Sequence, residues 1–256
     1  MSQAALFFDD KQYLRTVVAE KPPEESAAQA RAAARLAGCG QGARILDAGC
    51  GHGRHALPLA GAGYRVVGVD SSATLLAAAQ RSAHGARRPS FVRGSYAALP
   101  FAPASFDAVV CLGTALGYSE ELDRAALWQF RRVLATGGRL LIETLHRDQL
   151  GARLPEREER PLPSGAVLRF DRRFDRARGV MHETQRLVVG TRNCSPRSYE
   201  LRVYGERELR RMLEDAGFTV IGCHASLDGR GEPSPAAPLV LVAEADRRPL
   251  GSGLRE

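Results

Sequence analysis

The chain has 256 residues, of which 44% are hydrophobic, and a formal net charge of +7 at pH 7. This size suits one large domain, or one domain with an insertion, that buries a full core. The sequence has no long apolar run and no signal-peptide pattern at its N-terminus, so we expect neither a membrane protein nor a secreted one. The five cysteines are scattered and form no C-x-x-C pair, which disfavours disulfides and zinc and indicates a reducing cytoplasm.

The positive charge is concentrated in one part of the chain. Residues 147–211 contain 16 arginines and 10 acidic residues. A basic surplus can bind nucleic acid by neutralising phosphates, but interspersed charges of both signs are more typical of a solvated surface. We therefore expect nucleic acid to be a less favoured partner than a small molecule.

Helix and strand patterns alternate up to residue 145. The stretch 22–38 predicts a helix with a capping box of Ser26 and Gln29. Further helices are predicted at about 54–62, 71–85 and 119–138, and buried strands at 43–49, 64–70, 90–94, 106–112 and 139–145. In the last of these helices, the apolar residues at helical spacing are Leu122, Ala126, Phe130, Val133 and Leu134. Strands that alternate with helices require a parallel sheet covered on both faces, so the pattern indicates a doubly wound α/β fold.

The pattern changes after residue 145. Segments 166–175 and 179–190 flank a turn, and 198–204 alternates apolar and polar residues, so residues 146–204 are predicted to form a mostly antiparallel β insertion. A helix at 205–217 and strands at 218–224 and 238–245 then return to the core.

A glycine-rich loop follows the first predicted strand, in the sequence ILDAGCGHGR. Gly49, Gly51 and Gly53 permit a tight turn and the close approach of a ligand, and ligands of open α/β sheets bind at the carboxyl ends of the strands. Asp70 ends the second strand, where a carboxylate can accept hydrogen bonds from ribose hydroxyls. These features also fit a nicotinamide or flavin dinucleotide, because Gly51, Gly53 and Ala56 satisfy the pattern G-x-G-x-x-[G/A].

Asp47 distinguishes the two cofactor classes. A carboxylate beside the loop would repel a pyrophosphate by about 4 kcal/mol per charge pair at a separation of roughly 4 Å, and it would attract a cation. S-adenosylmethionine carries an ammonium and a sulfonium in place of the pyrophosphate, and it also has a ribose for Asp70. We therefore favour this cofactor over a dinucleotide.

Several ordered motifs resemble those of the class I S-adenosylmethionine-dependent methyltransferases. ILDAGCGHGRHALPLA is similar to their D-x-G-x-G-x-G motif, VVGVDSS to the segment with the ribose-binding acid, and FDAVVCLGTALGY to the fourth-strand motif. LATGGRLLIET is similar to their L-x-P-G-G-x-L segment, with Thr136 in place of proline. The resemblance covers about residues 26–145 and 204–245. It implies a Rossmann-like, mostly parallel seven-stranded sheet whose last strand is antiparallel, with the β insertion after the fifth strand.

The resemblance also implies the residues of the cofactor site. The methionine part of the cofactor would contact Asp47, Gly49 and Gly51, and Asp70 would bind its ribose. Ser95 stands where the family commonly has an aspartate that accepts a hydrogen bond from the adenine. The full set of predicted cofactor-binding residues is Asp47, Gly49, Cys50, Gly51, Asp70, Ser71, Ser95, Tyr96 and Leu112.

No catalytic residue is assigned. Transfer of a methyl group from a sulfonium needs alignment of the nucleophile and exclusion of water more than it needs a base. Tyr118, Glu143 and His146 are candidates near the cofactor, and Tyr13 is a candidate lid residue. His52 and His55 lie three residues apart, but no group of Cys, Asp or Glu in the sequence completes a metal site with them. No metal is therefore expected.

Together these features divide the chain into an N-terminal lid segment (1–25), a cofactor-binding core (26–145), an acceptor-binding cap (146–204), a return to the core (205–246) and a flexible tail (247–256). The leading prediction is a methyltransferase that uses S-adenosyl-L-methionine to methylate N or O of a small-molecule acceptor. The alternatives are an RNA or protein methyltransferase that uses the arginine-rich insertion, a non-catalytic cofactor-binding protein, and an NAD-dependent oxidoreductase. The acceptor, the methylated atom and the oligomeric state stay open.

Overall fold

The computed structural model describes residues 7–85, 87–149, 154–231 and 237–246. The first six residues of the predicted lid segment and the whole predicted tail, 247–256, lie outside the described residues. Within the described ranges, no helix is both long enough and apolar enough to cross a membrane.

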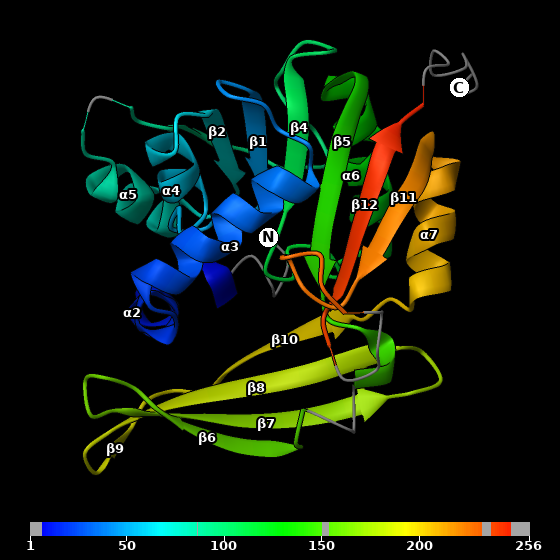
Figure 1. Cartoon of the computed structure of the whole chain (residues 1–256). Helices are drawn as coiled ribbons and strands as arrows, with labels where there is room; N and C mark the ends of the chain where they lie inside the picture. Colours follow the sequence, from blue (N-terminus) through cyan, green and yellow to red (C-terminus); the bar gives the residue numbers. More distant parts are fainter. Residues whose placement is uncertain (1–6, 86, 150–153, 232–236, 247–256) are drawn as a thin grey trace.

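A seven-stranded sheet forms the core of the molecule (Figure 1). Its strands are β1 (Arg44–Ala48), β2 (Arg65–Asp70), β3 (Ser90–Arg93), β4 (Phe106–Cys111), β5 (Leu134–Thr144), β11 (Phe218–His224) and β12 (Leu239–Ala245). They lie in the order β11-β12-β5-β4-β1-β2-β3. β12 is antiparallel to both of its neighbours, β11 and β5. The four remaining pairs, β5–β4, β4–β1, β1–β2 and β2–β3, are parallel. The predicted mostly parallel seven-stranded sheet with an antiparallel last strand is confirmed.

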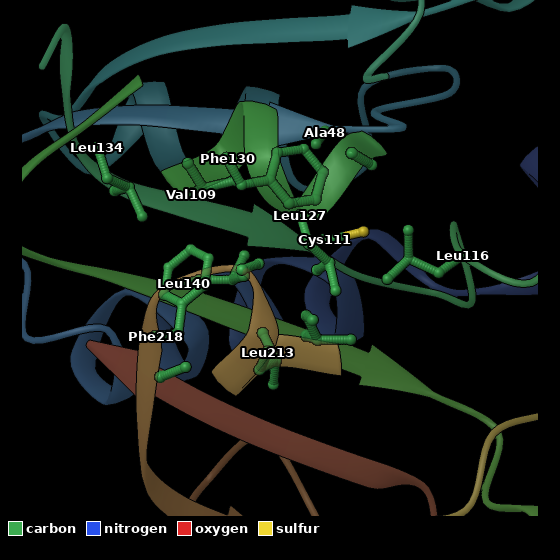
Figure 2. Close-up of a cluster of buried hydrophobic side chains, with 14 of the residues drawn as sticks. Ala48, Val109, Cys111, Leu116, Leu127, Phe130, Leu134, Leu140, Leu213 and Phe218 are labelled. Carbon is green, nitrogen blue, oxygen red and sulfur yellow. The ribbon is translucent and has the colours of Figure 1, made fainter. Parts of the chain in front are cut away.

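Helices cover both faces of this sheet. α3 (Pro23–Leu36) and α4 (Ala56–Gly61) share a hydrophobic cluster with Ile45 of β1. α6 (Glu120–Val133) and α7 (Glu206–Asp215) contribute to a second cluster with Leu46 and Ala48. Successive side chains of a strand point to opposite faces, so the two clusters lie on opposite sides of the sheet. Figure 2 shows the second cluster, with Phe130 of α6 close to the core strands. α5 (Ala73–Ser82) packs against β2 and β3.

The insertion between β5 and α7 forms a second sheet, which we call the cap sheet. After a short 3-10 helix, η1 (Arg147–Gln149), its antiparallel strands are β6 (Arg157–Pro161), β7 (Val167–Asp175), β8 (Val180–Val189), β9 (Arg192–Asn193) and β10 (Arg197–Arg202). In Figure 1 it lies across the end of the core sheet toward which β5 runs. The backbone N–H of Arg147 donates to the carbonyl oxygen of Tyr204 at 3.2 Å, so the chain leaves the core and rejoins it at one place. The predicted antiparallel β insertion is confirmed.

The start of α3 differs from the prediction. The helix begins at Pro23, and Ser26 is a buried residue within its first turn instead of the N-cap. Proline is preorganised for the first helical position, and Glu24 and Glu25 in the first turn interact favourably with the helix dipole. These effects start the helix before the predicted capping box.

The apolar face of α6 is narrower than predicted. Leu122 is 45% exposed, whereas Ala126, Phe130 and Val133 are fully buried. Leu122, in the first turn of the helix, lines a pocket instead. Leu134 is the first residue of β5 and not part of the helix.

Candidate active site

A cavity of about 280 Å³ opens at the carboxyl ends of β1, β2, β3 and β4. The loops that follow these strands form one side, and residues before α2 (Lys11–Glu20) and in its first turn form another. Of the residues predicted from the sequence, those that line the cavity are Gly49, Gly51, Asp70, Ser71, Ser95, Tyr96, Leu112, Tyr118 and Tyr13. The structure therefore brings most of the predicted site together in one place.

The glycine loop is pinned to β2 and closely packed. The backbone N–H groups of Gly49 and Cys50 both donate to the carbonyl oxygen of Val69, at 2.8 and 3.1 Å. Gly49 has φ +75°, and a Cβ atom there would lie 2.6 Å from Cβ of Ala115 in the loop after β4. Any side chain at this position would displace one wall of the cavity.

Asp70 lies at the centre of the site. Its Oδ2 accepts from the backbone N–H of Gly51 at 2.8 Å, and its Oδ1 accepts from that of Ser72 at 2.9 Å. Burial raises the pKa of Asp70, and these backbone hydrogen bonds oppose the rise. Each carboxylate oxygen can accept a further hydrogen bond, so the group can hold two adjacent hydroxyls of a ribose.

Asp47 does not line the cavity, which corrects its expected place at the mouth of the loop. Side chains alternate along β1, so Asp47 lies on the same face as Ile45, the face that α4 covers. It is 2% exposed, accepts a hydrogen bond from the backbone N–H of Ala56 at the start of α4, and its Oδ2 has no partner among the described residues. Its charge acts on the cavity across the loop instead of from inside it.

The pKa of Asp47 reflects this position. Burial raises the pKa to about 7, the charge of Arg54 opposes the rise, and that of Asp70 adds to it. The carboxyl group therefore changes charge near neutral pH, and a cation in the adjacent cavity would favour its ionised form.

Cys50 also points away from the cavity. A Cβ atom at Gly68 in β2 would lie only 2.7 Å from Sγ of Cys50, so the thiol packs between the loop and the sheet. Burial raises the pKa of this thiol far above its ordinary value. Cys50 is therefore an unreactive packing residue, and only its backbone belongs to the loop.

Ser95 is exposed at the rim of the cavity. Its hydroxyl oxygen accepts from the backbone N–H of Ala97 at 3.1 Å. The hydroxyl hydrogen is not used in this bond, so Ser95 can donate to a ligand as well as accept from one. Tyr96 next to it is anchored by its ring, whose centroid lies 6.4 Å from that of Phe130.

The candidate catalytic residues separate into two groups. Tyr13 and Tyr118 line the cavity, and burial holds the pKa of Tyr118 well above its ordinary value, so its phenol keeps its proton at neutral pH. Glu143 instead supports the loop after β4, because its Oε2 accepts from the backbone N–H of Gly113 at 3.0 Å. His146 is buried outside the cavity, and its Nδ1 accepts from the backbone N–H of Asp148 at 3.1 Å.

Residues 7–10, which we call the strap, lie within the predicted lid segment 1–25 and bring to the site side chains that the sequence analysis did not single out. Oδ1 of Asp9 accepts from Oγ of Ser72 at 2.9 Å and from the backbone N–H of Thr74 at 2.8 Å. The hydrogen bond from Thr74 is the main reason why the pKa of Asp9 is lowered. The strap is thus fastened to the start of α5, directly after the segment that carries Asp70. The only signal for it in the sequence is the aromatic and acidic run FFDD.

The strap also contacts the cap sheet. Phe8 lines the cavity, and its ring centroid lies 5.0 Å from that of Tyr118 and 5.8 Å from that of Tyr199 in β10. Oδ1 of Asp10, the N-cap of α2, lies 3.0 Å from Nη1 of Arg197 in β10. The strap therefore joins the core to the cap sheet across the cavity, and its aromatic rings shield the cavity from water.

Comparison with known proteins identifies the same core. Residues 45–138 match a family model described as a methyltransferase domain. Over 178 residues the chain is 30% identical to a protein of Encephalitozoon cuniculi assigned to the methyltransferases, an alignment that spans 69% of this chain and 70% of that relative.

Solved structures share the complete fold. The CcbJ methyltransferase from Streptomyces caelestis has a TM-score of 0.76 and 24% identity, with 88% of this chain and 90% of that one covered. CalS10, an amino pentose methyltransferase from Micromonospora echinaspora whose structure holds S-adenosylmethionine, has a TM-score of 0.69 and 23% identity, with 92% and 97% covered. At these identities the similarity establishes the fold.

Proposed function

The chain belongs to the class I S-adenosylmethionine-dependent methyltransferases, and from this we propose that it methylates a nitrogen or oxygen atom of a small-molecule acceptor. It is an enzyme whose cofactor is S-adenosyl-L-methionine. The nicotinamide and non-catalytic alternatives are accordingly set aside.

The residues of the cavity fit this cofactor. Asp70 retains acceptor capacity for the ribose hydroxyls, and Gly49 and Gly51 leave the backbone open to the methionine part. The Oδ2 atom of Asp47, which has no hydrogen-bond partner among the described residues, lies behind the glycine loop. When ionised, this carboxylate attracts the positive charge of a cofactor bound in the cavity. When bound, the cofactor supplies an electrophilic methyl group, and the chain has to position the acceptor and exclude water.

One observation supports a small acceptor most directly. The rings of Phe8, Tyr13 and Tyr118 form an aromatic wall along the cavity, which has a volume of about 280 Å³ and stays open on another side. A concave site of this size with an aromatic wall suits a small molecule that is largely buried on binding. The phenol of Tyr118 keeps its proton and donates a hydrogen bond to the carbonyl oxygen of Thr114 at 3.2 Å, so Tyr118 is not a base at neutral pH. An amine acceptor would lose its proton to solvent before attack.

Two further features support a small acceptor over RNA. Arginines of the cap sheet are paired within it, such as Arg169 with Glu159 at 2.7 Å and Arg172 with Glu183 at 2.5 Å, which leaves less charge for phosphates. The structural relative CalS10 is an amino pentose methyltransferase, which supports an amine nitrogen as one acceptor atom.

The test is to follow the label from methyl-labelled S-adenosylmethionine. Purified protein is incubated with a small-molecule extract and, separately, with RNA and with protein. We expect label in the small-molecule fraction, and transfer to RNA or protein alone would contradict the proposal. At limiting cofactor, Asp70→Asn should slow the transfer about tenfold or more, whereas Asp107→Asn, at the start of β4 away from the cavity and paired with Arg44 at 2.9 Å, should retain it.

A further inference from the structure

Arg197, on the buried face of the cap sheet, has two neighbouring guanidinium N–H groups that donate no hydrogen bond to any described residue. The side chain of Arg197, at the start of β10, is 12% exposed. Its Nη1 donates to Asp10 at 3.0 Å, but its Nε and Nη2 are buried and make no hydrogen bond with any described residue. Nε–H and Nη2–H point in the same direction from one side of the planar guanidinium. This is the geometry that binds two oxygens of a carboxylate or a phosphate.

Two side-chain amides near Arg197 each have one unpartnered atom. Gln185 in β8 is the residue paired with Arg197 across the two strands. Its Nε2 donates to Oε1 of Glu183 at 2.7 Å, and its buried Oε1, which can only accept, has no partner in the described part of the chain. Gln12 in α2 shares Oδ1 of Asp10 with Arg197 through its backbone N–H, and its Nε2 is likewise buried and unpartnered. Buried polar groups without partners are rare in folded proteins, and a group of them on facing elements indicates a missing ligand.

The charge balance at this place favours an anion. Burial lowers the pKa of Arg197, and the carboxylate of Asp10 offsets only part of that effect. The guanidinium nevertheless keeps its proton, since arginine does not lose it in proteins. Asp10 is 40% exposed and so is screened by water, which leaves a buried positive charge that is incompletely neutralised.

Arg197 lies directly behind the aromatic wall of the active-site cavity. Its Cζ is 5.1 Å from the ring centroid of Phe7 and 5.9 Å from that of Tyr13, which lines the cavity. Tyr199, two residues further along the same face of β10, has its ring centroid 6.0 Å from that of Tyr118, another lining residue. A small acceptor that presents its nucleophile to the cofactor can therefore extend along this wall toward Arg197.

We propose that Arg197, assisted by the side-chain N–H₂ of Gln12, binds an anionic group of the acceptor, a carboxylate or a phosphate. This inference rests on the proposed function and specifies its substrate class. The acceptor carries a pair of anionic oxygens at one end and the methylated nitrogen or oxygen at the other. Because the unpartnered atoms are buried, the strap has to move to admit the acceptor, and the anion then stabilises the closed arrangement.

The binding test uses inorganic phosphate and acetate as separate probes. Each is titrated at constant ionic strength into protein saturated with S-adenosylhomocysteine, and the Nε–H signal of Arg197 is followed by NMR. We expect a saturable shift with at least one probe. Arg197→Lys keeps the charge but loses the fork, and it should weaken binding of that probe about tenfold or more.

The matched control is Arg186→Gln, on the opposite, exposed face of the cap sheet next to Gln185. It should bind the probe as the unaltered protein does. Gln12→Leu removes one donor without altering a charge, and it should weaken binding severalfold even if variants of Arg197 do not fold. Absence of a saturable shift with both probes, or equal binding by Arg197→Lys, would overturn the inference.

A second measurement separates this inference from the proposed function. Labelled products of the small-molecule extract are divided by anion exchange, and we expect the label in the retained, anionic fraction. Label in the unretained fraction would contradict the anion site while leaving methylation of a small molecule intact. Failure to bind S-adenosylmethionine in calorimetry would instead contradict the proposed function itself.

Discussion

Substitution of Asp47 by asparagine tests how the buried carboxylate behind the glycine loop contributes to folding. Asp47→Asn keeps the size of the side chain and an oxygen that can accept from Ala56, but it removes the ability to ionise. In the cofactor-free protein, burial makes the charged form of Asp47 unfavourable. The variant should therefore lose a pH dependence of stability that the unaltered protein has.

The size of this effect follows from the pKa. Folding raises the pKa of Asp47 from 3.8 to about 7. Between these values the unfolded carboxyl group releases its proton while the folded one retains it, so stability decreases as pH rises, by about 1.4 kcal/mol per pH unit. From pH 5 to the folded pKa near 7 the loss is about 3 kcal/mol, and above that pH it levels off.

The assay is denaturation by guanidinium at pH 5 and at pH 8, without cofactor. Other titrating groups contribute equally to both proteins, so the difference between their two pH changes isolates Asp47. Asparagine also buries an amide N–H₂ where Oδ2 has no partner, at a cost of about 1–3 kcal/mol, but this cost is the same at both pH values. Equal pH changes in the two proteins would refute the assignment of a buried, neutral-pH-titrating carboxyl group.

Three further changes probe the site. Asp70→Asn should weaken cofactor binding in calorimetry by about tenfold or more, because charged acceptors form the stronger hydrogen bonds; unchanged affinity would remove this residue from the ribose site. Gly49 has φ +75°, and a Cβ there would lie only 2.6 Å from Cβ of Ala115, so Gly49→Ala should lower the free energy of unfolding by about 1–3 kcal/mol in chemical denaturation. A Cβ at Gly40 meets nothing within 4 Å, so the control Gly40→Ala should leave the stability unchanged. Equal effects of the two substitutions would contradict the close packing of the loop. Asp9→Asn should speed cofactor release severalfold in stopped-flow measurements, since it weakens the fastening of the strap, and an unchanged rate would show that the strap does not retain the cofactor.

The core sheet could be predicted because its signals are local. The strands predicted at 43–49, 64–70 and 106–112 are short runs rich in valine, isoleucine or leucine, and the first two end at Gly49 and Asp70. Burial on both faces requires such runs, and the strand ends then determine where Asp70 and the glycine loop meet. These positions left two cofactor classes open, and the charge of Asp47 together with the family resemblance favoured S-adenosylmethionine.

The position of Asp47 could not be predicted from its residue type and its place beside the loop. Its residue type was interpreted as a charge at the mouth of the loop, although its position in β1 places it on the α4 face with Ile45. The alternation of side chains along a strand was available in the sequence. What the sequence does not show is how far the strand extends before the loop begins, and that boundary decides which way the carboxylate points.

A lid was predicted over residues 1–25, but the contacts of the strap with α5 and with the cap sheet could not be predicted, for a different reason. Asp9 binds Ser72 and Thr74, residues 63 and 65 positions away, and Asp10 binds Arg197, 187 positions away. Such pairings depend on the tertiary arrangement of segments that carry no shared pattern. Charged residues near an N-terminus read as solvated surface until their partners are located.

The hydrogen bond between Arg147 and Tyr204 has a consequence for how this enzyme could be altered. Because the cap sheet begins and ends at neighbouring points, it is a cassette with two adjacent junctions, inserted beside a core sheet whose strand pairings do not involve it. A chimaera that exchanged residues 147–203 for the cap of a relative would keep those pairings and would also keep Tyr204, which packs in the core and donates to Asp123 at 2.7 Å. The strap residues that meet Arg197 and Tyr199 would have to be exchanged with the cassette, since their contacts are made to it.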